Sequence, residues 1–230
     1  MRRLALCAFA VAVATSPLLA AAQTQNPAAL QKACGGGDAK SCFDLGVIYE
    51  TGVHVAPDKA RAAGLYGKAC DAGSAGGCFA LGLMYKHGKG VAQNKAKAAE
   101  LHQKACDAGS DIGCWSAGRM CERGEGVAPD RDRAARLYRR ACDSAYAEAC
   151  YDLGLMYASG NGMTADKARA AELYRKACDA RYAQSCFTLG VLYLSGDGVP
   201  QDKAKATQLY RRACDGRYVD ACKALARDLH

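Results

Sequence analysis

The stretch CDAGSAGGC, residues 70–78, places two cysteines eight residues apart around a run of small residues. The same frame recurs as CDAGSDIGC at 106–114, CDSAYAEAC at 142–150, CDARYAQSC at 178–186 and CDGRYVDAC at 214–222, with a looser copy, CGGGDAKSC, at 34–42. Both cysteine series advance by 36 residues at every step. A fixed period in the range of 20 to 50 residues predicts a solenoid built from repeated units.

Each unit contains two segments with the pattern of an amphipathic helix. In the first segment an apolar face follows the i, i+3, i+4, i+7 spacing of Cys42, Leu45, Gly46 and Tyr49. The second segment repeats that spacing in Ala62, Leu65, Tyr66 and Ala69. Good N-cap residues precede the second segments, namely Asp58, Asn94, Asp130, Asp166 and Asp202. The Gly-x-Gly between the segments, such as Gly88 and Gly90, predicts a turn with positive φ.

One glycine inside the first helix recurs in every unit, at positions 46, 82, 118, 154 and 190. A glycine within a helix costs about 1 kcal/mol relative to alanine. Its return in all five copies predicts that two backbones approach each other closely at this point.

The cysteine spacing predicts disulfides across turns. Eight residues of helix span roughly 12 Å, whereas bonded cysteines need Cα atoms about 5.5 Å apart. Each pair must therefore join the end of one helix to the start of the next, at about 2–3 kcal/mol per bridge. The predicted bridges are Cys34–Cys42, Cys70–Cys78, Cys106–Cys114, Cys142–Cys150, Cys178–Cys186 and Cys214–Cys222. Zinc knuckles use shorter spacings and more histidine, so we expect no metal and no cofactor.

The N-terminus has the pattern of a secretory signal. Arg2 and Arg3 are followed by an apolar run and by the small residues Ala20 to Ala22, which predicts a signal peptide over residues 1–22 and a repeat domain over 23–230. Its removal lowers the formal net charge from +8 to +6. Fourteen cysteines suit an oxidising compartment. We therefore expect a secreted or periplasmic protein with no membrane span in the mature chain.

The repeated motif L-G-x-x-Y-x-x-G-x-G-V-x-x-D-x-x-x-A-x-x-L-Y-x-K-A resembles that of Sel1-like repeats, relatives of the tetratricopeptide repeats, over residues 27–230. The additional C-x7-C is similar to the exported, cysteine-rich Hcp subgroup, often catalogued as β-lactamases. The resemblance implies an α/α superhelix whose concave face binds protein or peptide. It also implies a second function, since some relatives are described as binding or slowly hydrolysing penicillins.

The expected fold is therefore all-α, an α/α solenoid of five 36-residue helix-turn-helix repeats stapled by disulfides. An N-terminal half repeat is expected over 27–41 and a C-terminal cap over 222–230. The five repeats are expected over 42–77, 78–113, 114–149, 150–185 and 186–221.

One first-helix row is apolar although it points away from the predicted core face: Ile48, Met84, Met120, Met156 and Leu192. Flexible methionines suit an adaptable groove floor for an apolar peptide, which makes Met84, Met120 and Met156 binding candidates. The alternative interpretation is a second packing surface against the neighbouring repeat.

The third repeat departs from its siblings. It contains the only tryptophan, Trp115, together with Arg119 and Arg123, and we include these three as groove candidates. Cys121 replaces a tyrosine and has no partner at the repeat spacing, so it is predicted to be a free thiol or a small buried residue. With His87 and His102 nearby in the sequence, a metal or haem site is a minor alternative.

The second helices carry two basic rows. One contains Arg61, Lys97, Arg133, Arg169 and Lys205, and the other contains Lys68, Lys104, Arg140, Lys176 and Arg212. Stacked repeats would align them into lines for an acidic partner, or local ion pairs and the helix dipole would account for them. Export and the lack of an aromatic ladder between the charges argue against nucleic acid.

Three functions remain open at this stage. The first is a scaffold that binds peptide or protein segments, for instance from the cell envelope, in a concave groove. The second is a weak β-lactamase, although no serine in the mature chain is followed by lysine in the Ser-x-x-Lys pattern. The third is a redox or haem-related assembly factor. The residues thus argue against an enzyme without naming any catalytic group.

Overall fold

The computed structural model describes residues 26–53 and 55–228, so the predicted signal peptide lies outside the described residues. The described part of the chain consists of twelve helices, α2 to α13, and contains no strand. None of these helices has the length and apolar character needed to cross a bilayer. The all-α solenoid expected from the sequence is therefore confirmed.

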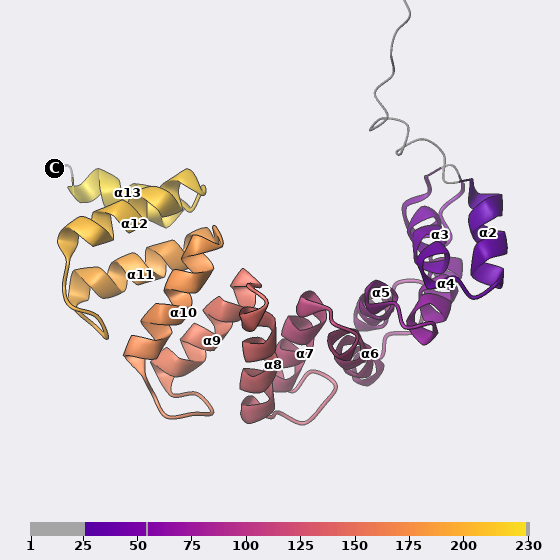
Figure 1. Ribbon diagram of the computed structural model, residues 1–230, viewed down its shortest axis with the longest axis horizontal. Coiled ribbons are helices and arrows are strands. Elements are labelled where there is room, and N and C mark those ends of the chain that lie inside the picture. The colour runs from indigo at the N-terminus through magenta and orange to yellow at the C-terminus, as the bar shows by residue number, and fades with distance from the viewer. Residues whose placement is uncertain (1–25, 54, 229–230) are drawn as a thin grey trace, which may run out of the picture.

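Five helical hairpins follow one another and curve into an open arch (Figure 1). Their first helices are α3 Ala39–Thr51, α5 Ala75–His87, α7 Asp111–Arg123, α9 Ala147–Ser159 and α11 Ala183–Ser195. Their second helices are α4 Lys59–Asp71, α6 Lys95–Asp107, α8 Arg131–Asp143, α10 Lys167–Asp179 and α12 Lys203–Asp215. Helices α2 Pro27–Gly35 and α13 Val219–Asp228 close the two ends. In the middle of the arch, α5 lies on the inner side and α6 on the outer side (Figure 1).

The second helices begin where the sequence predicts. Each predicted cap has an extended backbone, and its side chain accepts a hydrogen bond from the backbone N–H three residues later at 2.8–2.9 Å. The first helices end at left-handed glycines, of which Gly124 at φ 67° is one. A glycine is favoured there because a Cβ would be strained at positive φ.

The repeated helix glycine accommodates an aromatic ring. A Cβ on Gly118 would lie 2.8 Å from the ring of Tyr138 in the second helix of the same repeat. The other repeats show the same contact, at 2.6–2.8 Å, between Gly46 and Tyr66, Gly82 and His102, Gly154 and Tyr174, and Gly190 and Tyr210. The predicted close approach is present, and its nearest atoms belong to a second-helix ring. A second-helix backbone oxygen is also close in two repeats, since the Cβ would lie 3.4 Å from the carbonyl oxygen of Ala134 at Gly118 and 3.3 Å from that of Ala206 at Gly190.

All six predicted disulfides are present, with Cα–Cα distances of 4.3–4.8 Å. Cys70 lies in the last turn of α4 and Cys78 in the first turn of α5, and the other bridges join equivalent helix ends. Each bridge therefore closes the turn between one repeat and the next, as the spacing predicts.

Successive repeats also meet through the loops between their paired helices. A Cβ at Gly126 would overlap the backbone of Lys95, which begins the second helix of the preceding repeat. Gly90, Gly162 and Gly198 make the equivalent approach to Lys59, Arg131 and Lys167. The second glycine of Gly-x-Gly therefore permits close contact between repeats as well as a positive φ.

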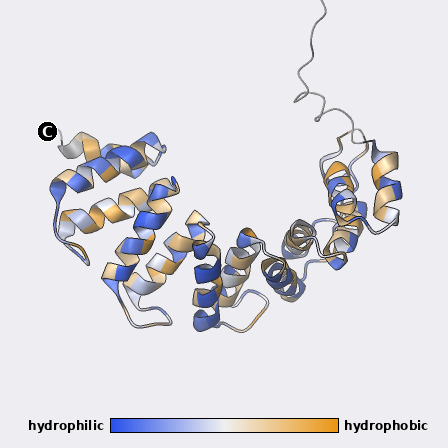
Figure 2. Ribbon diagram, viewed as in Figure 1, coloured by the Kyte–Doolittle hydropathy of each residue, from blue (hydrophilic) through white to orange (hydrophobic). Residues whose placement is uncertain are grey.

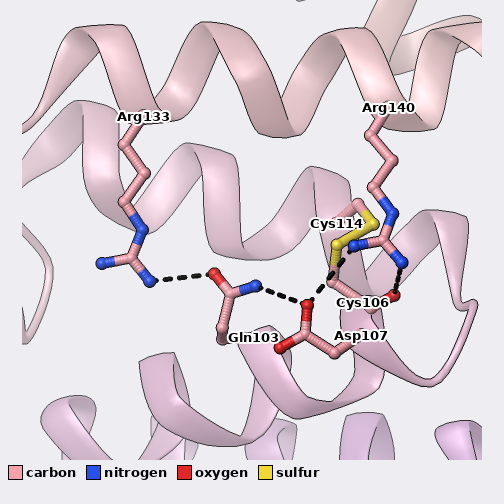
Figure 3. A network of polar contacts seen from close by, with 6 residues as sticks. All are labelled: Gln103, Cys106, Asp107, Cys114, Arg133 and Arg140. Atoms are coloured by element: carbon pink, nitrogen blue, oxygen red, sulfur yellow. Dashed lines mark hydrogen bonds and ion pairs between the residues drawn. A yellow bond between two sulfur atoms is a disulfide. The ribbon is translucent and has the colours of Figure 1, made fainter.

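The basic rows of the second helices are used in contacts within the solenoid. Arg140 donates to the carbonyl of Cys106 at 2.8 Å and pairs with Asp107 at 3.3 Å, which joins α8 to α6 (Figure 3). Arg133 donates to Gln103 at 2.9 Å in the same network. Other members of the first row lie over tyrosine rings at 4.2–5.1 Å, namely Arg61 on Tyr49, Lys97 on Tyr85, Arg169 on Tyr157 and Lys205 on Tyr193. Arg140 and Arg212 thus pair across repeats and not within their own helix.

The glycine–ring contact can be tested by adding one methyl group. We expect Gly118→Ala to lower the free energy of unfolding by about 1–3 kcal/mol, because the ring of Tyr138 must move. Gly64 is the matched control, since it is exposed in α4 with no atom near its missing Cβ. Gly64→Ala is expected to raise the free energy of unfolding by about 0.5–1 kcal/mol. Urea denaturation of both variants measures the difference, and equal effects would contradict the proposed packing.

His102 is an exception in the aromatic series. It takes the place of Tyr66 and Tyr138, is 1% exposed, and neither ring nitrogen has a hydrogen-bond partner. Tyr138 donates to Glu122 at 2.8 Å, whereas the equivalent of Glu122 beside His102 is Lys86. Burial, with the charges of Lys86 and His87, lowers the pKa of His102 from 6.5 to about 4.

The depressed pKa of His102 predicts acid sensitivity. The unfolded chain binds this proton near pH 6.5 and the folded chain only near pH 4, so stability is complete above 6.5 and falls as the pH drops. The loss by pH 4 is on the order of 3 kcal/mol. Urea denaturation at several pH values should show this loss in the wild type and its absence in His102→Tyr. His87→Gln, which changes an exposed histidine, should retain most of it; retention in His102→Tyr would refute the assignment.

Candidate binding site on the first helices

The methionine row is part of the core. Met84, Met120 and Met156 are exposed by only 1%, 0% and 2%. The prediction that they form an open groove floor is therefore wrong, and they serve as packing residues. The reason lies in the solenoid itself, because an inner helix such as α5 contacts α3, α4, α6 and α7. Its apolar face is consequently wider than the four positions of a simple amphipathic pattern.

An apolar row that is open lies one residue earlier. Val47, Leu83, Leu155 and Val191 hold the same position in four repeats and are exposed by 37–42%. In the third repeat this position is Arg119. We call these five side chains the inner row. Figure 2 shows more apolar colour on first helices such as α9 and α11 than on the strongly polar α8.

The inner row borders a pocket of about 550 Å³ formed by three successive repeats. Its walls come from α7, α9 and the start of α11, with the start of α8 and the loop after α9. We call it the α7–α9 pocket, and its lining residues are Trp115, Arg119, Glu122, Arg123, Arg131, Tyr151, Asp152, Leu155, Asn161, Tyr182 and Gln184. The pocket thus brings together three of the six predicted groove candidates, Trp115, Arg119 and Arg123.

Trp115 organises one wall of the α7–α9 pocket. Its indole Nε1–H donates to a carboxylate oxygen of Asp152 in the next repeat at 2.7 Å. The guanidinium of Arg119, one turn along α7, lies 4.7 Å from the centre of the indole ring. The tryptophan is therefore held between an anion on α9 and a cation on its own helix, which fixes the orientation of both charged groups.

The two carboxylates of the pocket already have neutral hydrogen-bond donors. Burial raises the pKa of Asp152, while the bond from Trp115 and the charge of Arg119 oppose that shift. Glu122 accepts from the hydroxyl of Tyr138, a buried group whose pKa is raised by burial and then by this bond. Neither carboxylate forms an ion pair with an arginine of the pocket in the described structure.

The three pocket arginines remain available. Arg119 and Arg131 form no ion pair within residues 26–53 and 55–228, and Arg123 only approaches Glu125 at 3.8 Å. Arg123 and Arg131 are exposed, whereas Arg119 is partly covered by its contact with Trp115. The pocket therefore presents guanidinium groups to solvent beside aromatic and apolar side chains, an arrangement suited to an anionic group on a ligand.

Sequence reasoning missed the tyrosines that extend the aromatic wall. Tyr146 and Tyr182 occupy the N-caps of α9 and α11 without a side-chain cap bond, where α5 and α7 use Ser74 and Ser110. Each tyrosine follows a left-handed residue, and these residues, Ala145 at φ 65° and Arg181 at φ 66°, are not glycines. A lost cap costs about 1 kcal/mol, and a non-glycine left-handed residue about 1–2 kcal/mol.

The packing of Tyr146 and Tyr182 against the aromatic residues of the preceding first helix offsets these two costs. Tyr146 lies 5.7 Å from Trp115 and Tyr182 lies 5.4 Å from Tyr151, measured between ring centres. The hydroxyl of Tyr182 donates to Gln184 at 3.2 Å, and Gln184 donates to the hydroxyl of Tyr151 at 3.0 Å. The available signal was the change from Gly-Ser in the earlier repeats to Ala-Tyr at 145–146 and Arg-Tyr at 181–182.

Cys121 lies apart from this pocket. It is free, buried and beside a smaller pocket of about 250 Å³ near Arg133. Burial raises the pKa of its thiol, which disfavours the reactive thiolate. Within the described residues, no group of three histidine, cysteine or acidic side chains is placed to hold a metal ion. The lining of the α7–α9 pocket contains no serine, cysteine, histidine or lysine.

The fold and its bridges define a disulfide-linked α/α solenoid. A model of the Sel1 repeat matches five segments of the chain, residues 39–74, 75–110, 112–146, 147–182 and 183–218. These segments span most of its length, and the chain therefore belongs to the Sel1 repeat family. No curated protein sequence matches the chain.

Solved structures of bacterial proteins share this architecture. A protective antigen of uropathogenic Escherichia coli is 29% identical with a TM-score of 0.85 over 89% of this chain and 44% of that chain. The chain thus spans less than half of that antigen. A Sel1 repeat protein from Oxalobacter formigenes is 26% identical with a TM-score of 0.77, covering 87% of this chain and 78% of that one.

Cysteine-rich protein B of Helicobacter pylori is 26% identical over 58% of this chain and 96% of that protein. Its TM-score is 0.49.

The pocket predicts a pH signal from the only tryptophan. Because Trp115 donates to Asp152, its fluorescence should change as that carboxyl ionises, with a midpoint above the ordinary aspartate pKa of 3.8. Asp152→Asn should abolish the transition, whereas Asp132→Asn on the exposed start of α8 should not. A transition that persists in Asp152→Asn would show that another group controls the indole.

Proposed function

We propose that this protein is an exported interaction scaffold that binds an extended polypeptide segment along its first helices. The bound segment would run across α5, α7, α9 and α11, along the inner row. The N-terminal signal pattern and the six disulfides support export to an oxidising compartment. The Sel1 repeat family, whose members resemble tetratricopeptide repeats in binding proteins, supports a protein partner.

The observation that carries this proposal is the exposure of the inner row. A single exposed leucine or valine is ordinary on a protein surface. Here the same position is apolar and 37–42% exposed in four of the five repeats. Stacking of the hairpins aligns these positions along the arch, so that they form a stripe and not isolated side chains. Such a stripe suits the alternating side chains of an extended peptide.

The outer side of the solenoid offers less for a partner. Its second helices carry the basic rows, and two arginines of these rows bond to neighbouring repeats, Arg140 to Cys106 and Arg212 to Cys178. Their tyrosines are buried beneath the first-helix glycines. The first-helix surface combines the exposed inner row with a pocket that presents guanidinium groups.

Hydrolysis of a β-lactam rests only on the subgroup resemblance. The α7–α9 pocket contains no serine nucleophile and no lysine to activate one. The groups it presents are guanidiniums, phenol hydroxyls, amides and two carboxylates. These groups suit recognition of a ligand better than attack on an amide, and we propose no enzymatic activity.

The proposal predicts selection of peptides by the immobilised protein. A phage-displayed library of random nine-residue peptides should give binders whose affinity falls at least tenfold with Leu155→Glu or Val191→Glu. These side chains are exposed, so the charges should disrupt binding without unfolding the protein. Biolayer interferometry with synthetic copies of the selected peptides measures the change.

Arg136→Glu is the control, because Arg136 is exposed on the second helix α8. It should leave the affinity unchanged. A library that gives no binders, or binders indifferent to both inner-row substitutions, would refute the proposed function.

A further inference from the structure

We propose that the α7–α9 pocket selects a segment with an acidic side chain, whose carboxylate binds Arg119 while apolar residues on either side contact the inner row. This inference rests on the proposed function and names the chemistry of the segment. It assigns to the irregular third repeat a role in specificity.

Arg119 interrupts the inner row between Leu83 and Leu155, so the stripe is apolar on both flanks and cationic in the middle. A leucine or valine satisfies the fold at this position in the other four repeats. The helix itself therefore does not require an arginine at this position, and the contact of Arg119 with Trp115 is particular to the third repeat.

The guanidinium of Arg119 is held in one orientation by its contact with Trp115. Trp115 holds Arg119 at 4.7 Å from its ring centre, and the indole is itself fixed by its bond to Asp152 at 2.7 Å. Arg119 has no ion-pair partner among the described residues. A guanidinium that is oriented in advance loses less conformational freedom on binding, and its planar donors match a carboxylate in two parallel hydrogen bonds.

The α7–α9 pocket carries an excess of positive charge. Three arginines, Arg119, Arg123 and Arg131, outnumber two carboxylates, Asp152 and Glu122. Both carboxylates accept hydrogen bonds from neutral donors, and burial holds the pKa of Asp152 above its ordinary value. The excess positive charge favours an anion. Three guanidiniums against two carboxylates leave one uncompensated positive charge, which the single charge of an aspartate or glutamate neutralises.

The first helices of successive repeats, such as α5 and α7, contact each other only marginally, so their spacing is at least the roughly 10 Å of packed helices. An extended chain advances about 3.3 Å per residue, so one repeat of the solenoid corresponds to at least about three residues of the bound segment. With an acidic residue on Arg119, residues three or more positions away on each side would lie near Leu83 and Leu155. The expected segment therefore has an aliphatic residue at least three positions before and at least three positions after the acid.

The peptide library described above tests this pattern directly. Binders of the wild-type protein should be enriched in aspartate or glutamate with an aliphatic residue three or four positions away on each side. The variant Arg119→Leu restores the residue type of Leu83 and Leu155, so it should fold, and its binders should have an apolar residue in place of the acid. Arg136→Leu, on the exposed part of α8, should select the same peptides as the wild type.

Synthetic peptides give the quantitative test. Two peptides without aromatic residues, identical except for aspartate or asparagine at the centre, are titrated into the protein by calorimetry and by fluorescence of Trp115. Trp115 is the only tryptophan and lies in the pocket, so its emission reports occupancy of this site. The aspartate peptide should bind about 10- to 100-fold more tightly to the wild type. That preference should disappear in Arg119→Leu and persist in Arg136→Leu.

The outcomes separate the two proposals. Selected peptides that contact the inner row but show no acidic preference would overturn this inference and leave the proposed function standing. The same holds if a phosphoserine peptide binds more tightly than its aspartate counterpart. No selected peptides at all would refute the proposed function. Quenching of Trp115 by an acidic oligosaccharide, with no peptide selected, would assign the pocket to carbohydrate and overturn both.

Discussion

The packing of one aromatic ring against one glycine determines the geometry of each hairpin. Gly118 lies over the ring of Tyr138, and the same pair recurs in every repeat with only His102 as a variant. The ring fills the space that any larger side chain on the first helix would occupy, so the two helices adopt the same separation five times. Equal hairpins then stack into a regular arch. The inner row and the α7–α9 pocket exist because equivalent first-helix positions are aligned in this way.

Repetition explains which parts of the structure were predictable. The 36-residue period, the helix caps and the six bridges depend on local geometry that recurs in every unit, and the sequence was sufficient for them. The inner row was missed because a helical wheel assumes one buried face. Helix α5 contacts helices on several sides, so Met84 is buried while Leu83, the residue before it, is open. A rotation of 100° along the helix separates the two rows.

The candidate site was predictable in part, for a different reason. Trp115, Arg119 and Arg123 attracted attention because they break the repeat, and the pocket brings them together. Their partners could not be inferred, because Asp152 and Tyr182 come from two later repeats whose alignment depends on the curvature of the arch. The basic rows show the same limit. Their pairing was expected within a helix, whereas Arg140 reaches Cys106 and Asp107 in the preceding repeat.

The eight-residue bridges have a mechanical consequence. Within the described part of the chain, each disulfide joins the end of one helix to the start of the next and none joins distant repeats, so the repeats can separate one at a time when the ends are pulled apart. Because a disulfide closes it, each eight-residue loop cannot extend under tension. At about 3.3 Å per residue, the extended length lost is roughly 25 Å per bridge. An oxidised molecule therefore lengthens less per opened repeat than a reduced one, and the redox state of its surroundings sets how far it can stretch.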